Sequence, residues 1–136
     1  MIEGPAQPSN RVVIDASALA AIAFGEPAGE ALGRRLEGAT VFAPALLKYE
    51  LANTAWKKAR RQPHQAAAIY RALATTLDDR WGIIWQDVDI TDAALVAQAL
   101  GVSAYDASYL WLAGSLGADL VTLDEPMARL SDALPT

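Results

Sequence analysis

The sequence predicts an α/β fold in which a short parallel sheet lies between two layers of helices. Short β-branched runs alternate with longer alanine-rich or amphipathic segments along the 136 residues, without repeats or low-complexity linkers. Such alternation is typical of parallel sheets, whose strands need helical crossovers. We expect one three-layer α/β/α domain over residues 11–131, with a flexible leader (residues 1–10) and a tail (residues 132–136).

The first elements are a strand and two short helices. The β-branched run RVVID (residues 11–15) predicts a buried strand that opens the fold. Ser17 is expected to cap an alanine-rich helix that ends near Phe24. The segment GEP (residues 25–27) breaks this helix, and its proline suits the first turn of a second helix over about residues 28–36.

A second strand and two long helices follow. The run TVFA (residues 40–43) predicts the strand, and Pro44 is expected to open a helix over about residues 45–61. Apolar side chains recur along this helix at three- and four-residue spacing, which predicts one buried face. Gln62-Pro63 ends it, and residues 64–79 predict a second long helix.

The last third of the chain repeats the strand–helix pattern. WGIIWQ (residues 81–86) predicts a strand, and Thr91 is expected to cap a helix over residues 90–100. Ser103 is expected to cap the next helix. DLVTLD (residues 119–124) predicts the final strand, with a short helix after it.

Composition excludes several classes of protein. The apolar fraction of 53% excludes general disorder, and no apolar run approaches the roughly 20 residues of a membrane helix. MIEGPAQPSN (residues 1–10) has no apolar core, so it is not expected to be a signal peptide. The chain has no Cys, which excludes thiolate metal sites and is compatible with a reducing cytoplasm. Its single histidine, His64, excludes multi-histidine sites.

Four carboxylates follow or interrupt apolar segments, namely Asp15, Glu50, Asp106 and Asp124. Isolated carboxylates are costly to desolvate, so four of them beside buried segments predict a shared site that needs negative charge. Two follow strands and two lie near the beginnings of helices, and these positions meet at one edge of a parallel sheet. The usual partner of converging oxygens is a hard divalent cation. Asp92 and Asp119 are expected to be surface or capping acids.

Two hydroxyl residues flank the acids, and each has two interpretations. Ser17 is either a plain helix cap or a group that orients the carboxylate of Asp15. Thr122 either reflects strand propensity or supports Asp124 in the same way.

A basic stretch follows Glu50 although the net charge of the chain is −5. Residues 48–71 contain six Lys or Arg residues and a single acid. The candidate RNA-binding residues in this stretch are Lys57, Lys58, Arg60 and Arg61. They form either a solvated helix face or a surface that contacts phosphates.

Three segments together resemble those of a known family. The first is VVIDASALAAIAFGEP, with Asp15 and Ser17; the second is APALLKYELANTAWK, with Glu50 and Asn53. The third is SAYDASYLWLAGSLGADLVTLDEPMARL, with Asp106 and, in the motif Thr-x-Asp, Asp124. The chain resembles PIN domains over about Val12 to Leu130, and most closely the VapC-type ribonuclease toxins of bacterial toxin–antitoxin pairs.

The resemblance implies a Mg²⁺- or Mn²⁺-dependent endoribonuclease. Phosphodiester hydrolysis needs an activated water and stabilisation of phosphate charge, which one or two Mg²⁺ can supply. Asp15 and Asp106 are the expected direct ligands, and Asp124 binds directly or through water. Glu50 either binds through water or positions or deprotonates the attacking water. Ser17, Asn53 and Thr122 are expected to support these groups.

The resemblance also implies partners. The family forms homodimers in the cytoplasm and binds an antitoxin whose C-terminal segment lies over the active-site groove. The chain's four Trp and four Tyr either pack in the core or contribute to such an interface. Trp56, beside Lys57 and Lys58, has a further interpretation, in which it stacks on a base of RNA.

Alternatives from other classes fit less well. A response-regulator receiver needs a second acid beside Asp15 and a late lysine, whereas no lysine follows Lys58. A haloacid-dehalogenase-type phosphatase needs Asp-x-Asp, and the chain has Asp-Ala-Ser. A PIN-like module that binds RNA or protein with little turnover stays open, because intact acids permit catalysis without proving it.

Overall fold

The computed structural model describes residues 10–134. The leader expected over residues 1–10 lies outside the described residues except for Asn10, as do the last two residues of the expected tail. The final helix of the structure extends to Ala133.

The described chain contains a four-stranded sheet in which every neighbouring pair is parallel. Its strands are β1 (Arg11–Ile14), β2 (Thr40–Pro44), β3 (Ile84–Gln86) and β4 (Asp119–Val121), in the spatial order β3-β2-β1-β4. The central strand β1 is apolar because both of its faces are covered, and Val12, Val13 and Ile14 are fully buried.

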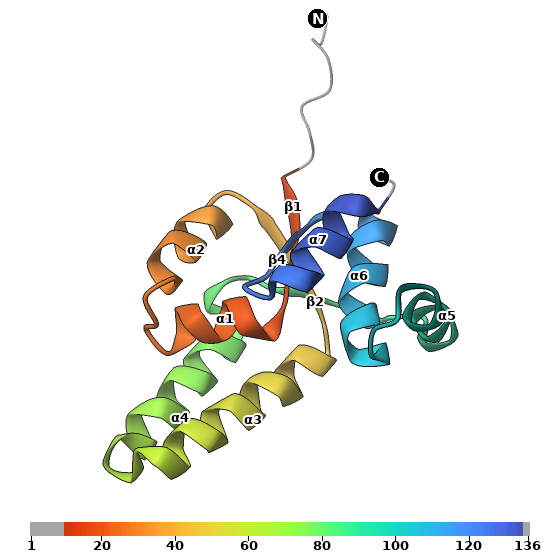
Figure 1. The fold of residues 1–136 in the computed structure, drawn as a ribbon. Helices are drawn as coiled ribbons and strands as arrows, with labels where there is room; N and C mark the ends of the chain where they lie inside the picture. Colours follow the sequence, from red (N-terminus) through yellow and green to blue (C-terminus); the bar gives the residue numbers. More distant parts are fainter. Residues whose placement is uncertain (1–9, 135–136) are drawn as a thin grey trace, which may run out of the picture.

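Helices cover both faces of this sheet, as the sequence predicts (Figure 1). Crossovers between parallel strands are right-handed, so the β1–β2 and β2–β3 connections lie on one face. The β3–β4 connection runs back across the sheet and lies on the other face. The first face carries α1 (Ala16–Ala23), α2 (Gly29–Leu36), α3 (Leu46–Arg61) and α4 (Ala66–Thr75); the second carries α5 (Ile90–Leu100) and α6 (Ala104–Leu116).

The last helix of the described residues is α7 (Glu125–Ala133), which packs against α6 and β4. Helices α3 and α4 form an antiparallel hairpin that extends away from the sheet (Figure 1). A small apolar cluster of Ala55, Ala59 and Ile69 holds the hairpin together. The hairpin therefore carries the basic stretch on an arm outside the main core.

Helix caps differ from the sequence prediction at two places. Asp15 rather than Ser17 caps α1, and Asp89 rather than Thr91 caps α5. In each case the carboxylate accepts the backbone N–H three residues ahead, which an ionised oxygen does more strongly than a hydroxyl. The predicted cap Ser103 is confirmed.

Element boundaries also differ. Pro44 is the last residue of β2 rather than the start of a helix, since it still pairs with Gln86 of β3. The helix expected over residues 64–79 is a 3₁₀ turn (Pro63–Gln65), then α4, then a π-helical turn (Thr76–Arg80). The last strand ends at Val121 rather than at Asp124, and Thr122, which follows it, donates its hydroxyl to Asp15.

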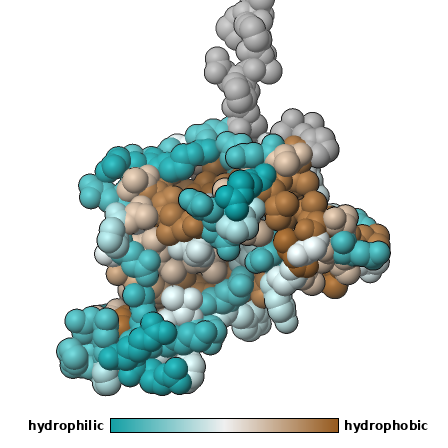
Figure 2. Space-filling model, viewed as in Figure 1, coloured by the Kyte–Doolittle hydropathy of each residue, from teal (hydrophilic) through white to brown (hydrophobic). Residues whose placement is uncertain are grey.

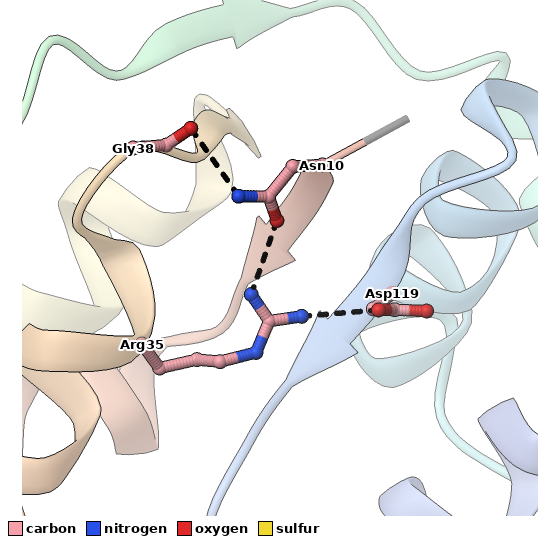
Figure 3. Close-up of polar contacts among 4 residues, drawn as sticks. All are labelled: Asn10, Arg35, Gly38 and Asp119. Carbon is pink, nitrogen blue, oxygen red and sulfur yellow. Dashed lines mark hydrogen bonds and ion pairs between the residues drawn. The ribbon is translucent and has the colours of Figure 1, made fainter. Parts of the chain in front are cut away.

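A polar cluster joins three segments at the amino-terminal edge of the sheet (Figure 3). Arg35 of α2 donates to Asp119 at the start of β4 over 3.0 Å and to the side chain of Asn10 over 3.3 Å. Asn10 in turn donates to the carbonyl of Gly38 over 3.2 Å. Asp119 is thus a surface acid with a cationic partner.

Candidate active site at the carboxyl edge of the sheet

Asp15 is the most enclosed of the four candidate acids. It follows β1 directly and is only 7% exposed. Its Oδ1 accepts the backbone N–H of Ala18 over 3.0 Å and the hydroxyl of Ser17 over 2.7 Å. Its Oδ2 accepts the hydroxyl of Thr122. Three donors therefore fix the carboxylate at the end of the central strand.

The two hydroxyl residues join the segment after β1 to the segment after β4. Each hydroxyl gives its proton to Asp15, so each acts as an acceptor toward its other neighbours. Ser17 Oγ accepts the N–H of Leu123 over 3.0 Å, and Thr122 Oγ1 accepts the N–H of Asp124 over 3.0 Å. Ser17 and Thr122 thus orient Asp15 and the loop that carries Asp124, although Ser17 is not the helix cap.

Glu50 lies in the first turns of α3 and is half-buried. Tyr109 of α6, which is 2% exposed, donates its phenolic hydrogen to Glu50 Oε1. Burial raises the pKa of Glu50 most; the Tyr109 bond opposes this rise, and the charges of Asp106 and Asp15 add to it.

Tyr109 is a site residue that the sequence prediction missed. Burial and the neighbouring charge of Glu50 raise the pKa of Tyr109 far above its usual value, so the hydroxyl keeps its proton and remains a donor. The only sequence signal is its position three residues after Asp106, which places both near one face of α6.

Asp106 and Asp124 complete the group from α6 and from the N-terminus of α7. The N–H of Asp106 is bonded to the cap Ser103 over 3.0 Å, and Asp124 caps α7 by accepting the N–H of Met127 over 3.0 Å. Burial, then the charges of Asp124 and Asp15, raise the pKa of Asp106. Each of the four acids is therefore close enough to be repelled by at least one of the others.

The group has no cationic partner in the described part of the chain. Every ion pair found among residues 10–134 involves other acids. Within the same residues, no three acid or histidine side chains form a ready set of metal ligands. A hard cation that keeps several waters still fits this donor set, because Mg²⁺ is commonly held by one or two carboxylates plus water and phosphate.

Asn53, predicted to support the acids, lies one helical turn after Glu50 and is exposed. Both residues line a hollow of about 460 Å³ between α1 and α3, which Ser17 and Leu123 also line. The hollow therefore lies beside both Glu50 and Ser17, which donates its hydroxyl to Asp15.

The four basic residues of α3 are placed differently. Lys58 is half-buried, lies 3.4 Å from Glu26 and packs over the ring of Phe24. Arg60 stacks over the ring of Trp56 at 4.6 Å. Lys57 and Arg61 are exposed. Figure 2 shows hydrophilic surface over the free end of the α3–α4 hairpin.

Comparisons with known proteins agree with this arrangement. The family model described as PIN domain matches residues 12–133. The chain is 33% identical over 136 residues to "Ribonuclease VapC3" of Pyrobaculum aerophilum, covering 93% of this chain and 98% of that protein. It is 31% identical over 121 residues to "Ribonuclease VapC12" of Mycobacterium tuberculosis, covering 87% and 90%.

A solved structure is similar as well. The crystal structure of PAE2754 from Pyrobaculum aerophilum superposes with a TM-score of 0.71 at 29% identity, covering 86% of this chain and 82% of that one. The fold is that of a parallel α/β protein with an acidic carboxyl edge. The chain belongs to the PIN domain family, which confirms the resemblance and the predicted fold class. In the part of the chain described here, no helix is both long and apolar enough to cross a membrane.

Proposed function

We propose that this protein is a metal-dependent endoribonuclease and the toxin of a toxin–antitoxin pair. The observation that supports this most is the acidic edge of the sheet, where Asp15, Glu50, Asp106 and Asp124 repel one another without a cationic partner among the described residues. The relatives named as VapC ribonucleases support the choice of RNA as substrate.

Asp15 and Asp106 would hold the Mg²⁺ or Mn²⁺, with Asp124 binding directly or through water. The ion, when bound, supplies an activated water and stabilises charge on the phosphate. Ser17 and Thr122 keep the carboxylate of Asp15 in one orientation, which preserves the spacing of the ligands.

Glu50 would position or deprotonate the attacking water. Tyr109 holds Oε1 and leaves the second oxygen of the carboxylate to receive a proton. Its raised pKa lies closer to neutral pH than that of an ordinary glutamate. A base transfers protons most efficiently when its pKa is near the pH of the reaction. Asn53 would assist from the same side of α3, at the wall of the hollow.

The proposal includes an antitoxin, a homodimer and a cytoplasmic location. Exposed apolar side chains support a protein interface: Ile90 and Leu95 of α5 are 72% and 58% exposed. Figure 2 shows hydrophobic surface on the same side of the molecule as α5, α6 and α7. Such exposed apolar surface is typical of protein interaction sites.

A cleavage assay on structured and unstructured RNA tests the activity. Cleavage should require millimolar Mg²⁺ or Mn²⁺ and stop in EDTA. Products from internal positions of end-blocked RNA would establish an endonuclease. RNA binding without cleavage under any of these conditions would contradict the proposal and favour a PIN-like binding module.

A further inference from the structure

Helix α3 presents two exposed stripes beside its buried face. The buried face consists of Leu47, Leu51, Ala55 and Ala59, at the spacing of a helix packed on one side. At 100° per residue, the remaining surface divides into a stripe that begins at Glu50 and a neighbouring stripe that begins at Tyr49.

The stripe that begins at Tyr49 is aromatic and is here called the aromatic stripe. It contains Tyr49, Asn53, Trp56 and Arg60, which follow one another at the i, i+4, i+7 and i+11 positions of one helix face. Tyr49 is 75% exposed and Trp56 is 48% exposed. The exposed large apolar side chains of α3 are thus both aromatic.

The stripe that begins at Glu50 is basic beyond its first turn. Lys57 and Arg61 lie two and three turns after Glu50 on the same face, and neither belongs to the ion pairs found within residues 10–134. Lys58, by contrast, is engaged with Glu26 on the side toward α1. Unpaired cations therefore run parallel to the exposed aromatics, and both stripes begin in the first turns of α3, where Glu50 lies.

We propose that the aromatic stripe stacks on unpaired nucleobases of the RNA while Lys57 and Arg61 contact its phosphates. This inference rests on the proposed function and adds a substrate-binding surface: the exposed face of α3, along which an unpaired strand enters the site. Aromatic rings stack on any base, and bases are available to them only when unpaired.

The geometry suits a strand of several nucleotides. Tyr49 and Trp56 are separated by about 10 Å along the helix, so they serve different bases. Arg60 stacks over Trp56 at 4.6 Å, which supports one face of the indole and adds positive charge beside it. Because each base–aromatic stack contributes about 1–3 kcal/mol, losing either ring should weaken binding about fivefold or more.

Binding of a fluorescein-labelled, unstructured 12-nucleotide RNA in EDTA tests the inference. Trp56→Ala and Tyr49→Ala should each weaken binding by about fivefold or more, and Trp56→Phe should retain most of the affinity. Tyr70→Ala is the matched control, because Tyr70 is 42% exposed but lies on α4; it should bind as wild type does. The same RNA annealed to its complement should show little sensitivity to the two substitutions.

Three results would overturn the inference. One is wild-type affinity in both alanine variants. Another is an equal loss for the duplex. The third is a change from dimer to monomer in Trp56→Ala by light scattering, which would make the stripe an interface between copies of the chain. Circular dichroism of each variant checks that the fold is retained, and Tyr49→Ala keeps the test valid if Trp56→Ala is unfolded.

A cleavage arm separates this inference from the proposed function. If wild type cleaves the unstructured RNA in Mg²⁺, both alanine variants should raise KM with little change in kcat, because the rings bind substrate away from the reacting phosphate. Wild-type kcat/KM in both alanine variants would contradict the stacking inference but not the proposed function. Absence of cleavage by wild type would contradict the proposed function, while the binding arm would still decide whether the rings stack.

Discussion

The two edges of the sheet use the same residue type in opposite ways. At the amino-terminal edge, Asp119 lies 3.0 Å from the guanidinium of Arg35, which also reaches Asn10 (Figure 3). At the carboxyl edge, Asp106 and Glu50 have acids rather than a cation as charged neighbours, and the pKa of each is raised. Asp119 with its own cation has a structural role, whereas under the proposed function the carboxylates without one receive a cation from solution.

The largest contrast should appear in catalysis. Asp106→Asn removes a charged ligand with little change in volume, so RNA cleavage in Mg²⁺ should fall by at least about 100-fold. Asp119→Asn makes the same chemical change at the opposite edge and should cleave as wild type does. A folded Asp106→Asn protein with the wild-type rate would remove Asp106 from the site.

The hydroxyl that orients Asp15 should have an intermediate effect. Thr122→Val keeps the shape of the side chain but removes the donor to Asp15 and the acceptor for the N–H of Asp124. Groups that orient metal ligands typically contribute about 10–100-fold, so kcat/KM and the affinity for Mn²⁺ should fall by that amount. Thr40→Val, at the start of β2, is the control. Equal activity in both variants would mean that Asp15 needs no such support.

Removing the metal should make Asp106→Asn more stable than wild type. In EDTA at neutral pH, Asp106→Asn should melt at a higher temperature than wild type, because it relieves repulsion from Asp124 and Asp15. Added Mg²⁺ should then stabilise wild type more than the variant; a ligand at 100 times its dissociation constant contributes about 2.7 kcal/mol.

The same comparison has a predictable pH dependence. A folded pKa above the unfolded value means that the folded protein keeps a proton the unfolded chain has lost, so stability falls as pH rises through this interval. Asp106 and Glu50 both have raised pKa values, and their full cost is reached above the folded values. The difference in melting temperature between Asp106→Asn and wild type should therefore shrink on acidification toward pH 4. A difference that grows on acidification would contradict this electrostatic account.

The smallest effect is expected at the amino-terminal edge. Arg35→Ala breaks the pair with Asp119, but the pair is open to solvent, with side chains 41% and 79% exposed. Exposed pairs contribute about 0–1 kcal/mol, so the free energy of unfolding should decrease by no more than this amount. RNA cleavage should be unchanged. A large loss of cleavage would show that the two edges are coupled.

Much of this arrangement could be predicted from the sequence. The alternation of strands and helices indicates a parallel sheet, and a parallel sheet brings the segments after Ile14 and Val121 to one edge, whatever the packing details. Local chemistry was less decisive at the caps: Asp15 and Ser17 are both good capping residues, and only the structure shows that the carboxylate caps α1 while the hydroxyl donates to it.

Contacts between distant elements could not be predicted. The bond from Tyr109 to Glu50 joins residues 59 positions apart and depends on how α6 is rotated against α3. The pairing of Lys58 with Glu26 likewise depends on the packing of α3 against α1. Sequence spacing alone placed Lys58 with the exposed cations, whereas the structure separates it from Lys57 and Arg61.

Direct binding of Mn²⁺ tests the central claim, that the acids of the carboxyl edge form one cation site. Titration of Mn²⁺ followed by electron paramagnetic resonance measures free and bound ion without any need for RNA. Wild type and Asp119→Asn should bind with equal affinity, and Asp106→Asn should bind at least about tenfold more weakly. Equal binding by all three proteins, or no binding by wild type at millimolar Mn²⁺, would contradict the account.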